Sequence, residues 1–413
     1  MSLFTLFGLS ALLNIYMGAR LVPDLAGQAV AQFVLAAVLA LCALAMPLGL
    51  TARRIARPAL SNALSWAGLL CMGLFSSLLV LTLARDALLA LFFLADLLAP
   101  GVLALARWRG VSAQAVPVLA GLVTLLGFLN ARRTAAVVRI DVPVAGLPAA
   151  WHGFAVAQIS DVHVGPTIRR RYVRRIVDKV NALEADMVAI TGDLVDGGVG
   201  ELAAQVAPLA DLRSRRGTFF VTGNHEYYSG ANAWIVELRR LGLTVLLNED
   251  VVFEAAESAP LVLAGVTDFG AGSYDAAHRS DPAAALRGAP PDATRVLLAH
   301  QPRSAAAASS AGFHLQLSGH THGGQFYPWN LFVRFQQPFT AGLRKWEKLW
   351  VYTSRGTGYW GPPKRFGAPS EITYLRLVAA CAPSAAGPTN PRGGLPCHSH
   401  TPTRCRSGRT DNW

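Results

Sequence analysis

Charged residues are scarce in this sequence. Asp, Glu, Lys and Arg make up 15% of the 413 residues, whereas a soluble domain carries about a quarter. Hydrophobic residues account for 52% of the chain, and the mean hydropathy is +0.35. This shortage of charge argues against a wholly soluble protein. The apolar excess is concentrated in the first third of the chain.

Cysteine and acidic residues are also few. All five cysteines lie outside the middle of the chain, at Cys42, Cys71, Cys381, Cys397 and Cys405. No disulfide framework is therefore expected there, and cysteine usage does not indicate the compartment. The excess of basic residues gives a net charge of +12, which suits anionic partners such as lipid headgroups or a phosphorylated substrate. No specific nucleic-acid partner is expected, because no aromatic-basic recognition motif is evident.

Four long uncharged runs fill most of the first third: Leu3–Ala19, Ala29–Thr51, Pro58–Ala84 and Val111–Ala131. Each is near the roughly 20 residues that cross a bilayer core. Since such runs have no polar face for water, they do not suit a soluble helical bundle. A cleaved signal peptide does not fit either, because the first run lacks a basic leading region and further runs follow.

A fifth candidate span, Ala87–Ala106, is interrupted by Asp96 and by the Pro100–Gly101 pair. We therefore predict a transmembrane region at residues 1–135 with four or five helices. The arginines at 53, 54 and 57 mark one loop as cytoplasmic. Four spans would place the rest of the chain on that same side, and five spans would place it on the other. The arginines alone leave both alternatives open.

Residues 140–378 are predicted to form an α/β domain. Apolar runs indicate seven buried strands: Phe154–Ile159, Met187–Thr191, Thr218–Thr222, Leu261–Val266, Val296–Ala299, Leu315–Leu317 and Leu349–Thr353. Helical patterns cover Ile168–Leu183, Glu201–Leu212 and Ala233–Leu241. Alternating strands and helices favour layered α/β structure. Pro, Ser, Thr, Gly and Arg dominate residues 379–413, which predicts a disordered basic tail. Its Cys and His residues fit no common zinc spacing.

Polar residues follow five of these strands. They lie in "ISDVHVG", "ITGDLVDG", "VTGNHEYY", "LLAHQP" and "LSGHTHGG", and comprise Asp161, His163, Asp193, Asp196, Asn224, His225, His300, His320 and His322. In open α/β folds, sites assemble beyond the carboxyl ends of strands. In extended backbone, residues i and i+2 point the same way. Asp161 with His163, and His320 with His322, could therefore each supply two ligands to one cluster. Glycines at 192, 223 and 319 permit the turns that aim these side chains.

The residue types indicate a centre for two divalent metals. Carboxylate, imidazole and amide oxygen are borderline-to-hard ligands that suit Mn, Fe or Zn. A central carboxylate can bridge two ions, and paired divalent ions about 3.5–4 Å apart are known to promote attack on phosphorus. Any one of these segments alone would be an ordinary turn or cap. Five in succession, each behind an apolar strand, make coincidence an inadequate explanation.

The order of these motifs resembles the calcineurin-like metallophosphoesterase superfamily. The motif sequences "GNHEYY", "LAHQP" and "SGHTHGGQ" are similar to those of its membrane-associated bacterial branch. This branch includes relatives of the UDP-2,3-diacylglucosamine pyrophosphatases of lipid A synthesis. The resemblance covers roughly Trp151–Leu377. It implies a four-layer α/β/β/α sandwich, here preceded by the transmembrane region. It also implies a multi-pass protein of the bacterial inner membrane.

The resemblance also implies a role for each site residue. Asp161, His163 and His322 would hold the first metal, and Asn224, His300 and His320 would hold the second. Asp193 would bridge the two metals, and a hydroxide bridging them would attack the phosphorus. His225 would protonate the leaving oxygen or steady the phosphoryl group, and Asp196 would orient His225. A histidine with a pKa near neutrality is a suitable general acid.

The substrate is constrained less than the chemistry. The segment Gly323–Trp350 combines eight aromatic residues with Arg334, Arg344, Lys345 and Lys348, a mixture that suits a membrane interface. It would line an entry for a lipid-linked phosphoester or pyrophosphate, unless its aromatic residues simply pack in the core. Lys364 and Arg365 could contact a phosphate or lie in a solvated loop. Two alternatives remain, namely a nucleotide phosphodiesterase or nuclease, and a non-catalytic membrane sensor.

Overall fold

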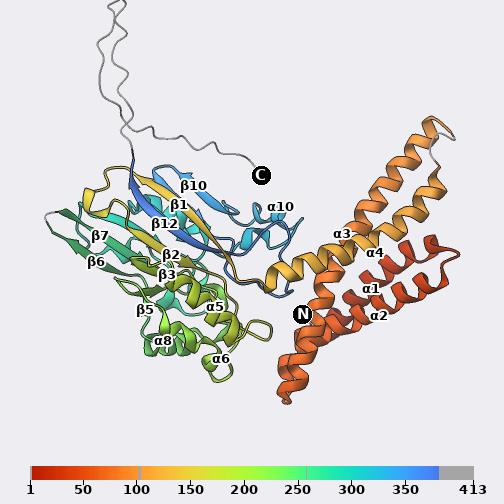
Figure 1. Ribbon diagram of the computed structural model, residues 1–413, viewed down its shortest axis with the longest axis horizontal. Helices are drawn as coiled ribbons and strands as arrows, with labels where there is room; N and C mark the ends of the chain where they lie inside the picture. Colours follow the sequence, from red (N-terminus) through yellow and green to blue (C-terminus); the bar gives the residue numbers. More distant parts are fainter. Residues whose placement is uncertain (1, 101–103, 257, 381–413) are drawn as a thin grey trace, which may run out of the picture. The chain divides into compact units, whose positions relative to one another are not determined.

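The structure is a computed structural model that describes residues 2–100, 104–256 and 258–380. The predicted tail, with its Cys and His residues from 381 onward, lies outside these described residues. Residues up to Ala380 form one compact unit. The unit contains four long helices followed by a domain with two sheets (Figure 1).

Four helices are long and apolar enough to cross a membrane: α1 (Leu3–Leu21), α2 (Ala29–Thr51), α3 (Pro58–Leu98) and α4 (Leu105–Arg132). They cover the four predicted runs. The fifth candidate is not a separate helix in the described residues, since its first part, Ala87–Leu98, continues α3. At 41 residues, α3 is about 62 Å long, which is twice the thickness of a bilayer core of about 30 Å.

Helix α3 continues past two adjacent charged residues, Arg85 and Asp86, because both are paired. Arg85 is 4% exposed and pairs with Asp24 in the short helix η1 (Pro23–Leu25) and with Asp86 at 3.5 Å. Arg20 of α1 also pairs with Asp86, at 2.8 Å. A charge within apolar helices is costly unless it is paired. Because these charges are paired, they do not have to end the helix.

Helices α2 and α3 cross closely at two glycines. A Cβ added to Gly49 would lie 2.7 Å from the Cα of Gly68, and one added to Gly68 would lie 2.6 Å from Ala45 O. Small residues at such crossings let helix backbones approach each other, as in membrane bundles. Many large apolar side chains on the outer faces are exposed, including Ile15, Phe33 and Leu125. Their number supports the prediction that lipid surrounds these helices.

Two six-stranded sheets form the centre of the second part of the chain. The first has the order β1-β12-β2-β3-β4-β5 and the second β10-β11-β9-β8-β7-β6. The strands of the first sheet are β1 (Ala136–Val144), β12 (Glu371–Ala379), β2 (Ala155–Ile159), β3 (Met187–Ile190), β4 (Thr218–Phe220) and β5 (Thr244–Val245). Those of the second are β10 (Gly342–Trp346), β11 (Leu349–Thr353), β9 (Leu315–Ser318), β8 (Thr294–Leu298), β7 (Ser258–Gly265) and β6 (Glu249–Ala255). Strands β2 to β5 are parallel, as are β7, β8, β9 and β11.

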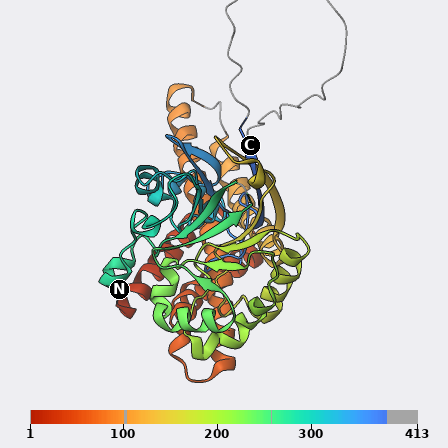
Figure 2. The same cartoon turned by 90° about the vertical axis from the view of Figure 1, so that its left-hand side faces the viewer.

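The sheets pack face to face between two outer layers. Helices α5 (Arg170–Asn181), α6 (Val199–Val206) and α8 (Ala231–Arg240) lie on the outer face of the first sheet (Figures 1 and 2). The short helix α9 (Ala305–Ser310) packs on the outer face of the second sheet. Buried side chains such as Val156, Phe219 and Leu298 fill the space between the sheets. The predicted four-layer α/β/β/α sandwich is thereby confirmed.

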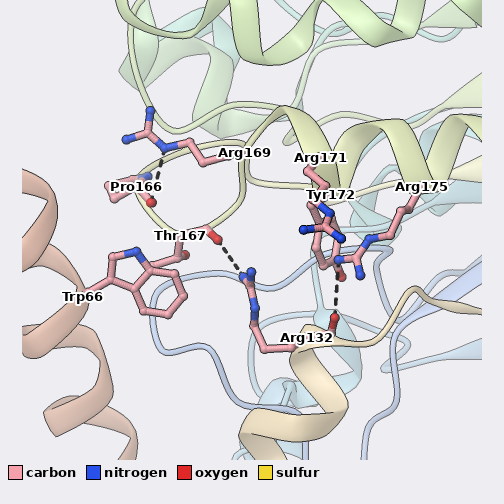
Figure 3. A pocket seen from close by; sticks show the side chains of 8 residues that line it. All are labelled: Trp66, Arg132, Pro166, Thr167, Arg169, Arg171, Tyr172 and Arg175. Atoms are coloured by element: carbon pink, nitrogen blue, oxygen red, sulfur yellow. Dashed lines mark hydrogen bonds between the residues drawn. The ribbon is translucent and has the colours of Figure 1, made fainter.

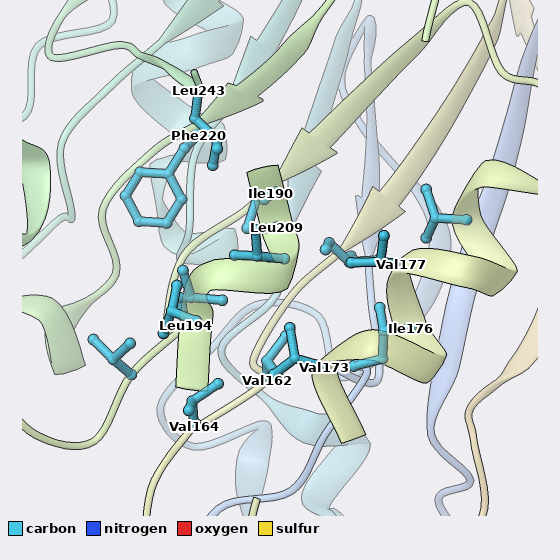
Figure 4. Close-up of a cluster of buried hydrophobic side chains, with 14 of the residues drawn as sticks. Val162, Val164, Val173, Ile176, Val177, Ile190, Leu194, Leu209, Phe220 and Leu243 are labelled. Carbon is cyan, nitrogen blue, oxygen red and sulfur yellow. The ribbon is translucent and has the colours of Figure 1, made fainter. Parts of the chain in front are cut away.

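Helix α5 shows how the outer layer is fixed. Its apolar residues recur at helical spacing, and Val173, Ile176, Val177 and Val180 are all buried, while arginines occupy half of the other positions. Burying each such side chain stabilises the fold by about 2 kcal/mol. They pack against residues of the loops after β2 and β3, such as Val162, in one apolar cluster (Figure 4). The core therefore extends directly beneath the loops that carry the predicted ligands.

Candidate metal centre

The loops after β2, β3, β4, β8 and β9 converge at the carboxyl ends of strands from both sheets. They bring the predicted ligands together. Donor atoms within 4.8 Å of one another form three overlapping groups: Asp161, His163 and His322; Asp193, His300 and His320; and His163, Asp193 and His225. The first two groups correspond to the two predicted metal sites, apart from Asn224 and the shared Asp193.

In the first group, two imidazoles face each other. The Nε2 atoms of His163 and His322 are 2.9 Å apart, and His322 Nε2 lies 3.5 Å from Asp161 Oδ1. Asp161 is fully buried, and its carboxylate accepts a hydrogen bond from the backbone N–H of His320 at 2.9 Å. Asp161 thus ties the "GHTH" loop to the loop after β2.

In the second group, His300 Nε2 lies 3.2 Å from Asp193 Oδ2 and 3.3 Å from His320 Nδ1. The other ring nitrogen of His300 is 2.7 Å from the carbonyl oxygen of Thr191. A proton on that nitrogen leaves the Nε2 lone pair directed at the centre. The side-chain oxygen of Asn224 is buried without a hydrogen-bond partner among the described residues. A buried orphan acceptor is expected where a ligand completes its bonding.

Asp193 lies between the two groups. Its Oδ2 is 3.2 Å from His300 Nε2 and 3.9 Å from His163 Nε2, so that it approaches one imidazole of each predicted metal site. Its Oδ1 accepts a hydrogen bond from the backbone N–H of His225 at 2.9 Å. This is the placement that a bridging carboxylate requires.

The backbone at the site is left-handed, not extended as expected. Positive φ angles occur at five predicted ligands: Asp161 (53°), His163 (54°), Asp193 (51°), His320 (70°) and His322 (52°). Such residues are uncommon, although Asp and His are enriched among them, and they persist where the surroundings hold them. Turns of this kind aim successive ligands at one centre more sharply than a strand could.

Buried apolar residues alternate with the ligands and hold these loops in place. Val162 lies between Asp161 and His163, and Leu194 follows Asp193; both side chains are fully buried in the cluster beneath α5 (Figure 4). The loop after β2 also hydrogen bonds with the loop after β3, through His163 N to Asp193 O at 3.1 Å. Core packing thereby supports the strained backbone.

Glycine is required here mainly by close approach. A Cβ on Gly319 would overlap the side chains of Ser160 and Asp161, and a Cβ on Gly223 would overlap Asp193 Oδ1. Of the three glycines singled out from the sequence, only Gly192 has a positive φ, of 85°. The other two allow neighbouring loops to touch.

The electrostatics favour a cation at this centre. Burial opposes the ionisation of Asp193, but the charge on His300 outweighs it and holds the pKa of the carboxyl well below its usual range. Burial also opposes the charging of His163, yet Asp196 and other carboxylates raise its pKa to about 9. A site that attracts protons to this degree also attracts metal ions, which compete for the same lone pairs.

Two other imidazoles are kept neutral. Burial and then the charge of His300 lower the pKa of His320 to about 3. Burial and then the neighbouring Arg365 lower the pKa of His322 well below its usual range. Neutral imidazole is the form that binds metal.

His225 and Asp196 are paired beside the centre. His225 Nδ1 lies 2.6 Å from Asp196 Oδ1, while its Nε2 is 4.0 Å from Asp193 Oδ2. The same oxygen of Asp196 lies 3.1 Å from His163 Nδ1. Burial opposes the ionisation of Asp196, but His163 outweighs it and lowers the pKa of the carboxyl. Asp196 therefore orients one predicted ligand as well as His225.

One structural residue, Glu226, was given no role on the basis of the sequence. Glu226 is fully buried, and its carboxylate accepts hydrogen bonds from the backbone N–H groups of Asp193, Leu194 and Gly223 at 3.0, 2.8 and 2.6 Å. It lies in the first turn of helix α7 (Asn224–Ser229) and fixes the loop that carries Asp193. The Glu three residues after Gly223 is a capping signal that could have indicated this role.

The basic pair in "GPPKRFG" contacts neither solvent nor the open side of the centre. Arg365 is fully buried and donates to His322 O at 2.9 Å, while its Nη2 lies 3.0 Å from His322 Nδ1. Lys364 is 1% exposed and donates to Gly73 O of α3 at 2.8 Å. The expectation of a solvated loop or a phosphate contact is therefore wrong. These side chains instead support His322 and bind to α3.

Exposed aromatic residues surround His225. The ring centroids of Tyr228 and Trp360 lie 5.1 and 5.8 Å from that of His225, and Tyr274 lies 5.8 Å from Tyr228. Each of the three aromatic side chains is 54–60% exposed. This aromatic rim is not evident from the sequence, because its members come from distant segments.

The aromatic segment after "GHTHGG" divides into two parts. Tyr327, Trp329, Phe332 and Phe335 are 43–73% exposed in and around α10 (Asn330–Val333). Trp329 also donates a hydrogen bond from Nε1 to Ser76 Oγ of α3 at 3.0 Å. Its later members pack instead, Phe339 against Trp346 and Trp350 against the core between the sheets. Core packing is therefore confirmed for the later part, whereas an entry for a lipid-linked substrate stays a prediction for the exposed part.

The donor set fits two divalent metals. Carboxylates, imidazoles and one amide oxygen converge from five loops, and Asn224 offers an unpartnered oxygen. Residues 154–324 match the calcineurin-like phosphoesterase family. A metallophosphoesterase of Aquifex aeolicus is 31% identical over 224 residues, which cover 54% of this chain and 84% of that protein. The chain therefore belongs to the calcineurin-like metallophosphoesterase family.

Other relatives include one that is named as a transmembrane protein. A transmembrane protein with metallophosphoesterase domain from Bos taurus is 43% identical over 278 residues, which cover 64% of this chain and 63% of that protein. A metallophosphoesterase of Helicobacter pylori is 41% identical over 226 residues, covering 53% of this chain and 58% of that protein. The chain thus spans less than two thirds of these two relatives. They include an animal protein as well as a bacterial one.

Proposed function

We propose that this protein is a membrane-anchored, metal-dependent phosphohydrolase that cleaves a phosphoester or pyrophosphate bond. The observation that carries the proposal is the position of Asp193 between two groups of metal-type donors. Hydrolases of phosphorus esters use such paired sites. All seven predicted ligands are present, which argues against a non-catalytic sensor.

The two metals would be Mn, Fe or Zn. Asp161, His163 and His322 would hold one ion, and the second would lie with His300, His320 and Asn224. Divalent ions bound there would activate water as the nucleophile and neutralise the phosphoryl oxygens. The absence of thiolates from the donor groups is consistent with these metals.

His225 is proposed to give its proton to the leaving oxygen. Asp196 holds the Nδ1 side of the ring at 2.6 Å, so that Nε2 is the nitrogen directed at the centre. General acids positioned in this way contribute about 10²–10⁴-fold to rate. Asp196 positions the ring through this contact.

The substrate is proposed to be amphiphilic. Exposed Tyr228, Tyr274 and Trp360 beside His225 offer apolar contact to a chain or ring next to the scissile phosphate. The exposed aromatic residues around α10 lie against α3 through Trp329, where they would meet lipid. A lipid-linked phosphoester or pyrophosphate satisfies both features, and a UDP-2,3-diacylglucosamine-like compound belongs to this class.

The anchor is proposed to be multi-pass, in a bacterial inner membrane, with the catalytic domain on the cytoplasmic side. Four helices place residues after α4 on the same side as the loop between α2 and α3. That side carries Arg53, Arg54, Arg57, Arg132 and Arg133, as the positive-inside rule requires for the cytoplasm.

The proposal is tested with a phosphoester panel and metal analysis of the purified full chain. Short-chain lipid phosphoesters, a sugar-nucleotide pyrophosphate, nucleotide diesters and bis-p-nitrophenyl phosphate would be assayed with Mn²⁺. We expect turnover of lipid-linked substrates and nearly two metals per chain. Asp193→Asn should lose both most of its metal and its activity. Preferred turnover of nucleotide diesters would favour the phosphodiesterase alternative, and no turnover with a full metal load would favour the sensor.

A further inference from the structure

A cavity that none of the proposed metal ligands lines lies where helices α3 and α4 meet the catalytic domain. Its volume is about 420 Å³. Four arginines line it, Arg132 at the end of α4 and Arg169, Arg171 and Arg175 at the start of α5, together with Trp66 of α3 and Tyr172 (Figure 3). No Asp or Glu lines it.

The four arginines have no acidic partner. None of them forms an ion pair within the described part of the chain, whereas Arg174, on the same helix, pairs with Asp211 at 2.6 Å. Arg169 reaches only Pro166 O and Asn62 Oδ1, at 3.3 and 2.7 Å. Like charges gathered around one cavity repel each other unless an anion neutralises them. The arrangement therefore calls for a ligand with negative charge.

Backbone carbonyls and aromatic rings hold two of the guanidinium groups. Arg132 donates to Thr167 O at 2.7 Å, and its Cζ lies 5.3 Å from the Trp66 ring centroid. Arg175 donates to Arg132 O at 3.4 Å and lies 5.2 Å from the Tyr172 ring. Figure 3 shows Arg132, at the end of α4, bonded to Thr167 and to Arg175 of α5. Guanidinium forks fixed in this way can bind a phosphate group with little loss of entropy.

The surroundings favour a lipid as the source of that phosphate. Trp66 belongs to a helix that could cross a membrane, and Arg132 is the last residue of another. Trp66 lies in the third turn of α3, and Trp and Arg near the ends of such helices are typical of the lipid headgroup region. None of the proposed metal ligands lines the cavity.

We propose that this arginine cavity binds the phosphate of an anionic phospholipid, separately from turnover at the metal centre. Bound there, the lipid joins α3, α4 and α5 through one headgroup. The site goes beyond the proposed hydrolase and does not depend on it.

The test measures lipid binding by the full chain in a neutral detergent. Dioctanoyl phosphatidylglycerol, dioctanoyl phosphatidylcholine and inorganic phosphate would be titrated while the thermal unfolding midpoint is followed. We expect phosphatidylglycerol to raise the midpoint most. Arg171→Gln with Arg175→Gln should weaken its apparent affinity by about tenfold or more, since each charge-assisted hydrogen bond to phosphate is strong. Arg170→Gln with Arg174→Gln removes the same charge from the same helix outside the cavity and should change it by less than about threefold.

Each other outcome overturns the proposal. Equal loss in both pairs of variants would indicate general attraction to the basic helix, and no loss in either pair would place the lipid elsewhere. An arginine-dependent shift with inorganic phosphate as large as that with the lipid would assign the cavity to a soluble anion. The binding readout is independent of hydrolysis, so Asp193→Asn should keep the lipid-induced shift.

Discussion

At the scale of single residues, His225 lies at the edge of the proposed metal centre. Asp196 contacts it at 2.6 Å, and the exposed rings of Tyr228 and Trp360 lie beside it. It nevertheless belongs to a donor group with His163 and Asp193. Acid catalysis and metal binding by His225 therefore predict different results on its removal.

For His225→Ala, we expect turnover of bis-p-nitrophenyl phosphate to fall by about 10²–10⁴-fold, the usual contribution of a positioned general acid. Metal content should stay at the parent value, because the proposed ligands are untouched. The measurements are kcat and elemental analysis of the purified protein. His152→Ala, at an exposed histidine, serves as the control. Loss of metal together with activity would make His225 a ligand, and unchanged kcat would remove it from the mechanism.

Glu226 holds the backbone of Asp193, the proposed bridging residue, through hydrogen bonds. Its two oxygens accept several backbone N–H groups, including that of Asp193. Glu226→Gln places an amide N–H₂ against those donors, so it should destabilise the fold by about 1–3 kcal/mol and lower the metal content. Thermal unfolding and elemental analysis check this. Glu254→Gln, at an exposed glutamate, should shift stability by less than about 0.5 kcal/mol. A Glu226→Gln protein with the parent's midpoint and metal content would contradict the argument.

At the scale of elements, the sequence located the strands and helices that carry strong periodicity. All seven predicted strands and three predicted helices of the domain are present. Strand β5 is only two residues long, and β1 has partly exposed, irregular burial, so neither produces a clear apolar run. The C-terminal end of α3 was missed because Arg85 and Asp86 suggest a boundary, whereas tertiary pairing with Asp24 and Arg20 neutralises them.

For the site too, local sequence indicated some features, whereas others depend on tertiary contacts. Its ligand types and their order were readable, because each follows an apolar strand. Their left-handed backbone at Asp161, His163 and Asp193 was not, since it depends on contacts between loops far apart in the chain. For the same reason the aromatic rim and the buried Arg365 could not be assigned from local sequence.

Lys364 connects the domain to the helical region. It donates to Gly73 O and Ser77 Oγ of α3 at 2.8 and 2.5 Å, and burial lowers its pKa to about 8. Between pH 8 and about 10.5, the unfolded chain would hold a proton on this lysine that the folded chain has released. Stability should therefore rise with pH in this window, by at most about 1.4 kcal/mol per pH unit.

Lys364→Met removes this titration, so the stability of the variant relative to the parent should fall as the pH rises from 8 to 10. The thermal unfolding midpoint of the full chain in detergent, measured across this range, provides the check. Lys348→Met, at an exposed lysine, controls for the loss of one charge. A constant difference between Lys364→Met and the parent would show that burial does not govern this lysine.

At the scale of the whole molecule, the four helices connect the position of the domain to the distribution of arginines. The proposed cytoplasmic side carries Arg53, Arg54 and Arg57 with Arg132 and Arg133, while the other side carries Arg20, Arg107 and Arg109. Contacts of the domain agree with this grouping. A Cβ on Gly165, in the loop after β2, would lie 3.5 Å from Arg53 Nη2, and Arg169 donates to Asn62 of α3 at 2.7 Å.

This grouping predicts the outcome of reporter fusions. Green fluorescent protein fused after Leu377 should fluoresce, because it folds in the cytoplasm, and alkaline phosphatase at the same point should be inactive. Fusions after Gly27, between α1 and α2, should show the opposite pattern, since one helix separates that loop from the cytoplasmic side. Active alkaline phosphatase after Leu377 would place the metal centre outside the cytoplasm. The arginine-rich ends of α2 and α4 would then face outward, against the positive-inside rule, and the cavity beside Trp66 would meet the outer leaflet.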